Sequence, residues 1–269
     1  MVSSTKSKSH PGRRPLVVGN WKMNGTRASS VALLAALRAE EPFGSEVSVC
    51  CPYPYLADVV LSLQGSGISW GAQDCSHLDP GAHTGDVAAV MLTEFGCRYV
   101  IVGHSERRVH HAESDQRVAD KARMALAHGL TPIVCVGETL DERVAMLTES
   151  IVKRQLSAVV HTLGHCVSQI VVAYEPIWAI GSGLTATPEQ AQAVHSVLRA
   201  QLAAASTLAG EMRLLYGGSV TAANAHALFA QPDIDGGLVG GASLKANEFS
   251  AICRAATGAA LESPGKLKT

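Results

Sequence analysis

The sequence has no excess of either charge and no long hydrophobic run. Lysine and arginine total 22 and aspartate and glutamate total 23 among 269 residues, which leaves a net charge of −1 with neutral histidines. A chain this close to neutrality has no overall field to attract nucleic acid or an anionic membrane, so any anionic ligand must be bound by local groups. No stretch reaches the roughly 18 consecutive apolar residues that suggest a membrane span, and we expect no membrane interaction.

Cysteines at zinc-ligand or disulfide spacing are also missing. The seven cysteines are scattered along the chain and include no C-x-x-C. The sequence therefore predicts neither a structural zinc site nor a disulfide framework. A reducing compartment fits this pattern best, so we expect a cytoplasmic protein. No cluster of metal-ligating residues is evident either, and we expect chemistry without a metal.

Both ends of the chain are predicted to lie outside the folded domain. Residues 1–14 are basic and have no apolar core, which excludes a secretory signal. We interpret them as a disordered tail, with a transit peptide as the alternative because acidic residues are absent. Residues 259–269 are expected to form a C-terminal tail, so residues 15–258 remain for the folded part.

Eight short apolar runs recur along the chain. Several are rich in valine and isoleucine without polar alternation, which is typical of strands that are buried on both faces. The runs cover residues 16–19, 47–51, 68–72, 99–103, 132–137, 170–174, 213–218 and 235–241. Segments with apolar residues at helical spacing separate most of them, at 29–41, 114–129, 142–164 and 185–205. In the last of these, Thr187, Pro188 and Gln190 form a helix start signal.

Strand and helix alternating eight times predict an α/β fold with a parallel sheet. Eight units in about 250 residues match a closed (β/α)8 TIM barrel, with eight parallel strands surrounded by helices, in a single domain. A doubly wound open sheet is the competing architecture, and it would favour a GxGxxG after an early strand, which is absent here. In a barrel, the C-terminal ends of the strands carry the chemistry.

Three reactive side chains stand at or just after predicted strand ends, namely Lys22, His104 and Glu175. A lysine supplies a compact positive charge for an anionic substrate. A histidine at the start of a helix is biased toward its neutral form, and a neutral imidazole can donate to a carbonyl. A partly buried carboxylate has a raised pKa and can serve as a general base.

Each of the three also has a structural interpretation. Lys22 could be an ordinary surface lysine, and His104 is one of 11 histidines. Glu175 could be a strand-end carboxylate that is paired with Arg107 or Arg108. A barrel would decide between these alternatives, because it brings the ends of the first, fourth and sixth strands around one centre.

Two glycine turns, at 216–220 and 239–244, follow the last two predicted strands. Glycine lets backbone N–H groups approach phosphate oxygens, and Ser219 could add a hydroxyl donor. Tight turns are the commonest use of glycine pairs. Phosphate binding after strands seven and eight nevertheless recurs in this architecture, so we favour an anion site.

Several quoted segments carry a resemblance to one family. GNWKMN, GAHTGD, YVIVGHSERR, ESD, TPIVCVGET, AYEPIWAIGSG, YGGSV and LVGGASLK occur in the order found in triosephosphate isomerases. The match runs from about Leu16 to Phe249, which is nearly the whole chain. The resemblance implies interconversion of dihydroxyacetone phosphate and D-glyceraldehyde 3-phosphate by proton transfer through an enediolate, in glycolysis and gluconeogenesis. It implies no cofactor.

The resemblance also implies roles for individual residues. Glu175 matches the base, His104 the electrophile at the carbonyl, and Lys22 the positive charge, with the polar group Asn20 beside it. The positions that match phosphate ligands are Gly181, Ser219, Gly240 and Gly241, and those that match supporting residues are Ser105, Glu106 and Cys135. Residues 176–186 match a closing lid, which includes Pro176, Trp178, Gly181, Ser182, Gly183 and Leu184. A lid would shield a labile enediolate from water.

The family is usually dimeric, so the resemblance implies a homodimer. Residues 71–86 resemble the loop that enters the partner subunit, where Thr84 would approach the partner's Asn20. A polar loop of this length is otherwise a simple surface excursion.

Four positions depart from the common pattern of the family. Ser182 stands where threonine is usual and Leu184 where lysine is common, and we expect the second change to affect the kinetics of the lid hinge. Asp74 replaces an asparagine and His83 an aromatic residue, and both lie in the interface loop. These two changes bear on dimer strength and its pH dependence.

Two other functions stay open from the sequence. One is a catalytically silent, phosphate-binding barrel that acts as an interaction protein, although intact Lys22, His104 and Glu175 argue against it. The other is a different sugar-phosphate enzyme on the same barrel, such as an indole-forming or ribulose-phosphate enzyme. Such enzymes share the phosphate turns but not the GNWKMN, GHSERR and YEPIW segments.

Overall fold

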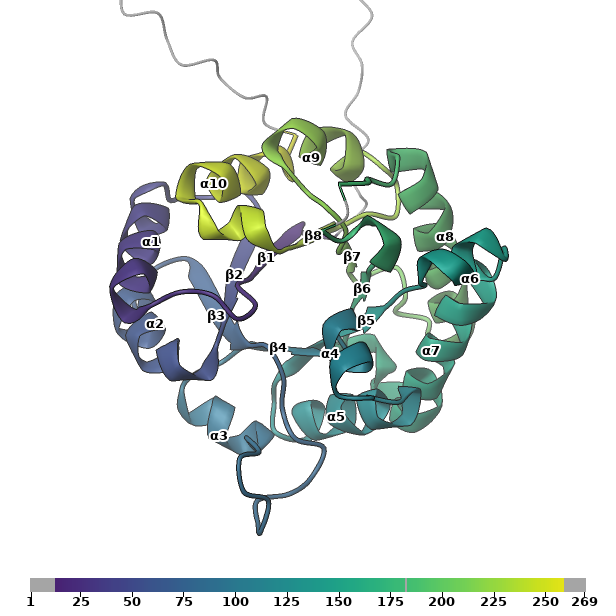
Figure 1. Ribbon diagram of the computed structural model, residues 1–269, viewed down its shortest axis with the longest axis horizontal. Helices are drawn as coiled ribbons and strands as arrows, with labels where there is room; N and C mark the ends of the chain where they lie inside the picture. Colours follow the sequence, from purple (N-terminus) through teal and green to yellow (C-terminus); the bar gives the residue numbers. More distant parts are fainter. Residues whose placement is uncertain (1–12, 182, 259–269) are drawn as a thin grey trace, which may run out of the picture.

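The computed structural model describes residues 13–181 and 183–258. Eight strands pair in parallel in chain order, and the last pairs with the first, so that the sheet closes into a barrel (Figure 1). The strands are β1 (Leu16–Asn20), β2 (Glu46–Cys51), β3 (Ile68–Ala72), β4 (Tyr99–Val102), β5 (Thr131–Val136), β6 (Val171–Tyr174), β7 (Leu214–Tyr216) and β8 (Gly236–Val239). The closed barrel is confirmed, and each strand falls within one residue of a predicted apolar run.

The strands lack polar alternation because both of their faces are buried. Alternate residues of β1 belong to two different hydrophobic clusters. Leu16 and Val18 pack inside the barrel, and Val17 packs against the surrounding helices. The same alternation holds on β5, where Ile133 and Cys135 pack inside the barrel. Apolar residues therefore suit both faces of these strands, as is typical of parallel sheets covered on both sides.

The helices form a ring around the barrel (Figure 1). They are α1 (Arg27–Ala39), α2 (Leu56–Leu63), α3 (Ala89–Glu94), α4 (Ser105–His110), α5 (Asp115–Ala127), α6 (Leu140–Val144), α7 (Thr148–Leu163), α8 (Pro188–Ala205), α9 (Ala222–Phe229) and α10 (Ala246–Ala255). The predicted start of α8 is confirmed. Thr187 accepts the Gln190 N–H through its side chain, and the Gln190 side chain accepts the Thr187 N–H, which is a capping box.

The predicted helix at 142–164 is wrong in one respect, because this segment contains two helices. A capping box between Thr139 and Glu142 starts α6 at Leu140, before the predicted boundary. The chain then turns at Met146, whose φ of 59° lies in the left-handed region that interrupts a right-handed helix. The apolar spacing continues across this turn, so periodicity alone could not reveal it. Gly164, with a φ of 54°, ends α7 as predicted.

Candidate active site

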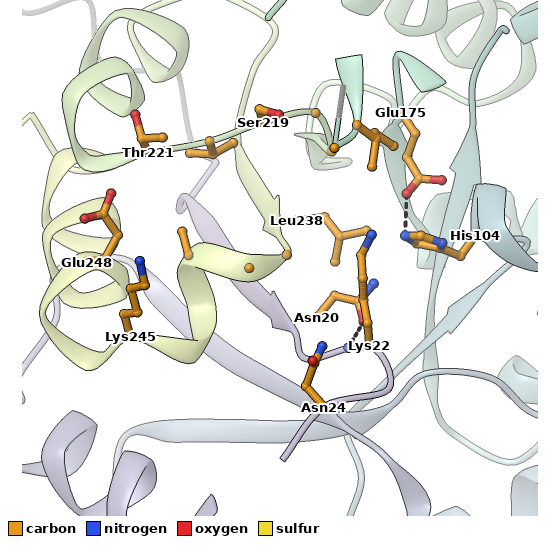
Figure 2. Close-up of a pocket in the computed structure, with 18 residues that line it drawn as sticks. Asn20, Lys22, Asn24, His104, Glu175, Ser219, Thr221, Leu238, Lys245 and Glu248 are labelled. Carbon is orange, nitrogen blue, oxygen red and sulfur yellow. Dashed lines mark hydrogen bonds and ion pairs between the residues drawn. The ribbon is translucent and has the colours of Figure 1, made fainter. Parts of the chain in front are cut away.

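A pocket of about 510 Å³ lies at the C-terminal ends of the strands (Figure 2). It brings together residues from segments that are far apart in sequence. Its lining includes the predicted site residues Asn20, Lys22, His104, Glu175, Gly181, Ser219, Gly240 and Gly241. Closure of the barrel therefore collects the expected catalytic side chains, both glycine turns and part of the predicted lid around one cavity.

Glu175 directly follows β6, and its side chain is buried with 2% exposure. Two neighbouring glycines leave room for it. A Cβ on Gly137 would lie 1.8 Å from the Glu175 carbonyl oxygen, and a Cβ on Gly217 would lie 2.9 Å from its Cγ. One carboxylate oxygen accepts the Ser105 N–H at 2.8 Å. The other lies 2.8 Å from Nε2 of His104.

His104 follows β4 and serves as the N-cap residue of α4, which begins at Ser105. Its Nδ1 accepts the Glu106 N–H at 3.2 Å. With Nδ1 accepting, the ring proton of the neutral form sits on Nε2, and this nitrogen points at Glu175 (Figure 2). The local fold thus fixes both the tautomer and the direction of the imidazole.

The Glu175–His104 contact changes the pKa of both groups. Burial acts to raise the pKa of Glu175, but the imidazole and the Ser105 N–H lower it more, so this pKa lies below its ordinary value. Burial acts to lower the pKa of His104, but the carboxylate raises it more. The sequence predicted a raised pKa for Glu175 and a neutral His104. Both pKa shifts have the opposite direction because the two groups touch, which the sequence could not reveal.

Lys22 follows β1 in a strained backbone conformation, with a φ of 53°. Such a conformation is uncommon for a residue with a side chain and is frequent at functional sites. The Lys22 N–H donates to the side-chain oxygen of Asn20 at 3.0 Å, which stabilises the turn. Nζ of Lys22 lies 2.6 Å from Glu106, and the lysine side chain is about one-quarter exposed. The cation therefore borders the pocket with an acidic partner on α4.

The structural interpretation of Glu175 as the partner of an arginine is wrong. Arg107 pairs with Asp74 and Glu113, and Arg108 pairs with Asp115. The carboxylate of Glu175 instead contacts the His104 imidazole and the Ser105 N–H.

The supporting positions implied by the resemblance lie around this pair. Ser105 contacts Glu175 through its backbone, and Glu106 contacts both Lys22 and His104. Cys135 is fully buried inside the barrel. Burial, and then the nearby Glu175 carboxylate, raise the pKa of this thiol well above its ordinary value, so it is not a nucleophile here.

The two glycine turns line the pocket, and the turn after β8 lies close to Lys22, whose Cε would be 3.4 Å from a Cβ on Gly240. Gly217, Gly218 and Ser219 follow β7, and Gly240 and Gly241 follow β8. Gly241 begins a short 3-10 helix, η4 (Gly241–Leu244), and the first N–H groups of such a helix have no partner within it. Backbone N–H groups in such turns can bind an anion, and the phosphate site here stays a prediction.

Ser219 also contacts the predicted lid. Its hydroxyl donates to the carbonyl oxygen of Ala179 at 2.8 Å. The Ser219 hydroxyl therefore donates to the predicted lid and not toward the pocket. To donate to a phosphate, as the sequence predicts, it would have to leave Ala179.

The predicted lid begins with Pro176 and a single 3-10 turn, η3 (Ile177–Ala179). Gly181 and Gly183 have φ values of 67° and 80°, which side chains rarely adopt, so both glycines are required by the backbone. Both are exposed, and Leu184 is 52% exposed. Ser182 lies outside the described residues.

Sequence reasoning missed Glu138, a fully buried carboxylate at the same rim. It accepts from the hydroxyl of Tyr174 at 3.0 Å and from Nε1 of the lid residue Trp178 at 2.9 Å. Arg143 lies 3.3 Å from the same oxygen. The only available signal was its position in GETLDER, directly after a predicted strand.

The predicted interface loop projects from the ring of helices between β3 and α3 (Figure 1). Thr84 and His83 near its tip are exposed, and Asp74 at its base pairs with Lys121 and Arg107. A second pocket, of about 440 Å³, is lined in part by Met23. The contact of Thr84 with a partner's Asn20 stays a prediction.

Residues 13–181 and 183–258 contain no group of three or more histidine, cysteine, aspartate or glutamate side chains that could hold a metal ion. Within the same ranges, every helix is too short or too polar to cross a membrane.

Comparison with known proteins gives a consistent result along most of the chain. The family model described as triosephosphate isomerase matches residues 15–256. A triosephosphate isomerase from Paracidovorax citrulli (strain AAC00-1) is 62% identical over 248 residues, covering 91% of this chain and 99% of the relative. Relatives of the same name from Delftia acidovorans (strain DSM 14801 / SPH-1) and Bordetella pertussis (strain Tohama I / ATCC BAA-589 / NCTC 13251) are each 59% identical, covering 91% and 90% of this chain and 99% and 98% of the relative.

Proposed function

We infer that this chain, which belongs to the triosephosphate isomerase family, interconverts dihydroxyacetone phosphate and D-glyceraldehyde 3-phosphate at the pocket described above. The observation that carries the site assignment is the contact of Glu175 with His104 at 2.8 Å, beside Lys22 and between the two glycine turns. A base, a proton donor, a cation and an anion site thereby border one cavity.

We propose the following roles in the reaction. Glu175 removes a proton from the carbon next to the carbonyl, and the electron pair of that C–H bond moves to form an enediolate. Nε2–H of His104 donates to the carbonyl oxygen, and Lys22 stabilises the negative charge that develops there. His104 then moves a proton between the two oxygens, and Glu175 returns its proton to the neighbouring carbon.

The observed position of Glu175 is a resting position in this scheme. Its carboxylate is occupied by the Ser105 N–H and by His104, and these contacts lower its pKa. To reach a substrate carbon, the carboxylate must leave them. The move removes the interactions that lower the pKa of Glu175, and it also removes the charge that raises the pKa of His104. Substrate binding would thus produce a stronger base and a neutral imidazole together.

The phosphate group of the substrate would bind at the glycine turns. Ser219, Gly240 and Gly241 line the pocket, and so does Gly181 on the lid. Closing the lid over the phosphate would exclude water and hold the enediolate. This role gives a reason for the two left-handed glycines at the lid tip.

A coupled assay on the purified protein tests the activity. We expect formation of glyceraldehyde 3-phosphate from dihydroxyacetone phosphate, and inhibition by 2-phosphoglycolate, which mimics the enediolate. Binding of this mimic without turnover would favour the silent phosphate-binding barrel. Turnover of a larger sugar phosphate, with none of the trioses, would favour another enzyme on the same barrel.

We also propose that the protein is a homodimer located in the cytoplasm. The projecting loop and the pocket beside Met23, which is 97% exposed, support self-association, because an exposed apolar side chain beside a cavity suits a partner. Analytical ultracentrifugation is expected to give twice the mass of the chain, and Thr84→Arg should shift the protein toward monomer. A monomeric parent protein would contradict the proposal.

A further inference from the structure

We propose that Glu248 is a positioning residue that holds the two glycine turns of the pocket at the spacing that a phosphate group requires. Its Oε1 accepts the N–H of Ala222 at 2.9 Å, and this bond joins α10 to the first residue of α9. α10 follows the turn after β8, and α9 follows the turn after β7. The proposal rests on the function given above, and it assigns a role to a pocket residue outside the proton-transfer scheme.

The start of α9 and the glycine turn before it form one unit. Thr221 accepts the Asn224 N–H through its side chain, and the Asn224 side chain accepts the Thr221 N–H. The side-chain amide of Asn224 also donates to the carbonyl oxygen of Ser219 at 3.0 Å, which ties the turn to the helix. The first N–H groups of a helix have no partner within it, and Glu248 supplies the partner for the N–H of Ala222.

The turn after β8 is anchored to the barrel. Ser243 is fully buried, and its hydroxyl donates to the carbonyl oxygen of Gly240 at 2.7 Å. A Cβ on Gly19 of β1 would lie 3.0 Å from the Cβ of Ser243, so η4 packs directly on the first strand. α10 begins at Ala246, directly after this anchored segment. Glu248 therefore projects from an element whose position is fixed by the barrel.

The carboxylate of Glu248 is directed at a neighbouring helix. Glu248 is the third residue of α10, where a glutamate commonly reaches back to the residue before its own helix. Here it contacts α9 instead, at the positive end of that helix, which stabilises a negative charge. Figure 2 shows Glu248 between Thr221 and Lys245, and all three residues line the pocket. The bond therefore connects the two helices at the edge of the candidate phosphate site.

The turn after β7 needs this contact because another of its partners belongs to the predicted lid. The Ser219 hydroxyl donates to Ala179, and that bond breaks if the hydroxyl turns to a phosphate. The bond between Glu248 and Ala222 involves neither the lid nor this hydroxyl, so it is kept in both states. Donors that are already in place bind a phosphate most tightly, because no free energy is lost in ordering them. Loss of the bond should therefore weaken phosphate binding and leave the proton-transfer groups in position.

The test uses the full chain with two variants of similar side-chain length. Glu248→Met removes the acceptor, whereas Glu248→Gln has an amide oxygen that can still accept the N–H of Ala222. Titration calorimetry measures the affinity for 2-phosphoglycolate, and competitive inhibition of the isomerase assay measures the affinity for inorganic phosphate.

We expect Glu248→Met to bind both ligands about threefold to tenfold more weakly than the parent, as loss of one hydrogen bond to a charged group allows. KM should rise in parallel, and kcat should stay within about twofold of the parent. We expect Glu248→Gln to bind both ligands at least as tightly as the parent, because it keeps the bond and removes a negative charge near the anion.

Glu41→Ala is the matched control. Glu41 also accepts a backbone N–H from another segment, that of Gly67 at 2.6 Å, but this bond lies just before β3 at the N-terminal end of the barrel. We expect this variant to keep the affinity for both ligands and the KM of the parent. Circular dichroism and urea unfolding would check the fold of every variant.

Two outcomes would overturn the proposal. If Glu248 were only a negative charge near the anion, Glu248→Met and Glu248→Gln would both bind the two ligands more tightly than the parent. If its bond served only the stability of the fold, folded Glu248→Met would bind them as the parent does. Glu248→Ala should behave as Glu248→Met does, so parent-like binding by folded Glu248→Ala refutes the proposal even if Glu248→Met fails to fold. A failure of the proposed function differs from these results, because the parent protein itself would then neither bind 2-phosphoglycolate nor isomerise trioses.

Discussion

The two ends of the barrel both bury charged groups, but they use them differently. At the N-terminal end, Asp235 is 1% exposed and contacts Arg13 at 2.7 Å and Arg199 at 2.6 Å. At the C-terminal end, Glu175 contacts a titratable histidine and one backbone N–H. Permanent cations fix the first carboxylate in place, whereas the second has partners that a substrate can replace. The difference separates a network of permanent charges from a titratable pair at the candidate active site.

A second cluster at the N-terminal end follows the same rule. Glu46 at the start of β2 contacts Arg213 at 2.7 Å, Arg98 at 3.2 Å and the hydroxyl of Tyr99. Burial acts to raise the pKa of Glu46, but Tyr99 and Arg213 lower it more, so the carboxylate stays charged. These ion pairs connect the starts of several strands and stabilise the N-terminal end of the barrel. The candidate site lies at the other end, where side chains can move without breaking these contacts.

The largest expected effect comes from moving the base at the reactive end. Glu175→Asp keeps the charge and its buried setting but shortens the side chain by one methylene, which displaces the carboxylate from the substrate carbon. We expect kcat to fall roughly a thousandfold, because proton transfer requires close alignment. Steady-state kinetics would measure the change, and circular dichroism would check the fold. Near-normal turnover would contradict the assignment of Glu175 as the base.

Replacing the imidazole should have the next largest effect. His104→Gln can still donate a hydrogen bond, but it cannot move a proton between the two substrate oxygens. We expect kcat to fall roughly a hundredfold while the affinity for 2-phosphoglycolate changes only a few-fold. If the variant chiefly weakened binding and left kcat intact, His104 would be a binding residue and its proposed role would be wrong.

Most of the fold, and the gathering of the candidate site residues around one pocket, could be predicted from the sequence for identifiable reasons. Strands buried on both faces leave unbroken apolar runs, and Thr187 with Gln190 marks a helix start chemically. Side chains placed after such strands, as His104 and Glu175 are, must meet once the barrel closes. Their contact at 2.8 Å, which sets both pKa directions, depends on side-chain positions that no local pattern encodes.

The parts that escaped prediction are pairings between elements far apart in the chain. Nothing in the local sequence distinguishes Arg199 and Asp235 from surface charges. Their side chains lie 2.6 Å apart only in the folded barrel. Glu138 and Trp178 likewise lie 40 residues apart in the chain, and their contact is tertiary. The break at Met146 was missed for a different reason. The apolar spacing continues through this turn, and only the positive φ of Met146 reveals that the helix is interrupted.

Breaking the network at the N-terminal end should affect stability without affecting chemistry. Asp235→Asn keeps the shape of the side chain but leaves Arg13 and Arg199 without their shared charge. We expect a loss of about 3 kcal/mol in the free energy of unfolding, with kcat unchanged at a temperature where the variant is folded. Urea unfolding would measure the loss. Glu149→Gln, in an exposed pair with Lys153, is the matched control and should cost less than about 0.5 kcal/mol. A large fall in kcat for Asp235→Asn would contradict the division between the two ends.

A fully buried histidine on α8 gives the smallest effect, and its sign follows from its surroundings. Nδ1 of His195 donates to the carbonyl oxygen of Asp233 at 3.0 Å, and its ring packs edge-on to Tyr174. Burial lowers the pKa of His195 to about 4, against the contributions of Asp233 and the nearby Asp235. The folded protein therefore holds this imidazole neutral, whereas the unfolded chain protonates it below a pH of about 6.5.

The stability contributed by His195 is present above a pH of about 6.5 and is lost as the pH falls toward 4, because only the unfolded state binds the proton in that window. His195→Asn keeps a donor toward Asp233 but cannot titrate. We expect the free energy of unfolding of this variant to depend less on pH, by about 1.4 kcal/mol for each pH unit between 6 and 5. The exposed His165→Asn should leave the slope unchanged. If the free energy of unfolding of the parent and of His195→Asn had the same slope against pH, His195 would not cause the acid sensitivity. Titratable groups at the C-terminal end of the barrel would then be the next candidates.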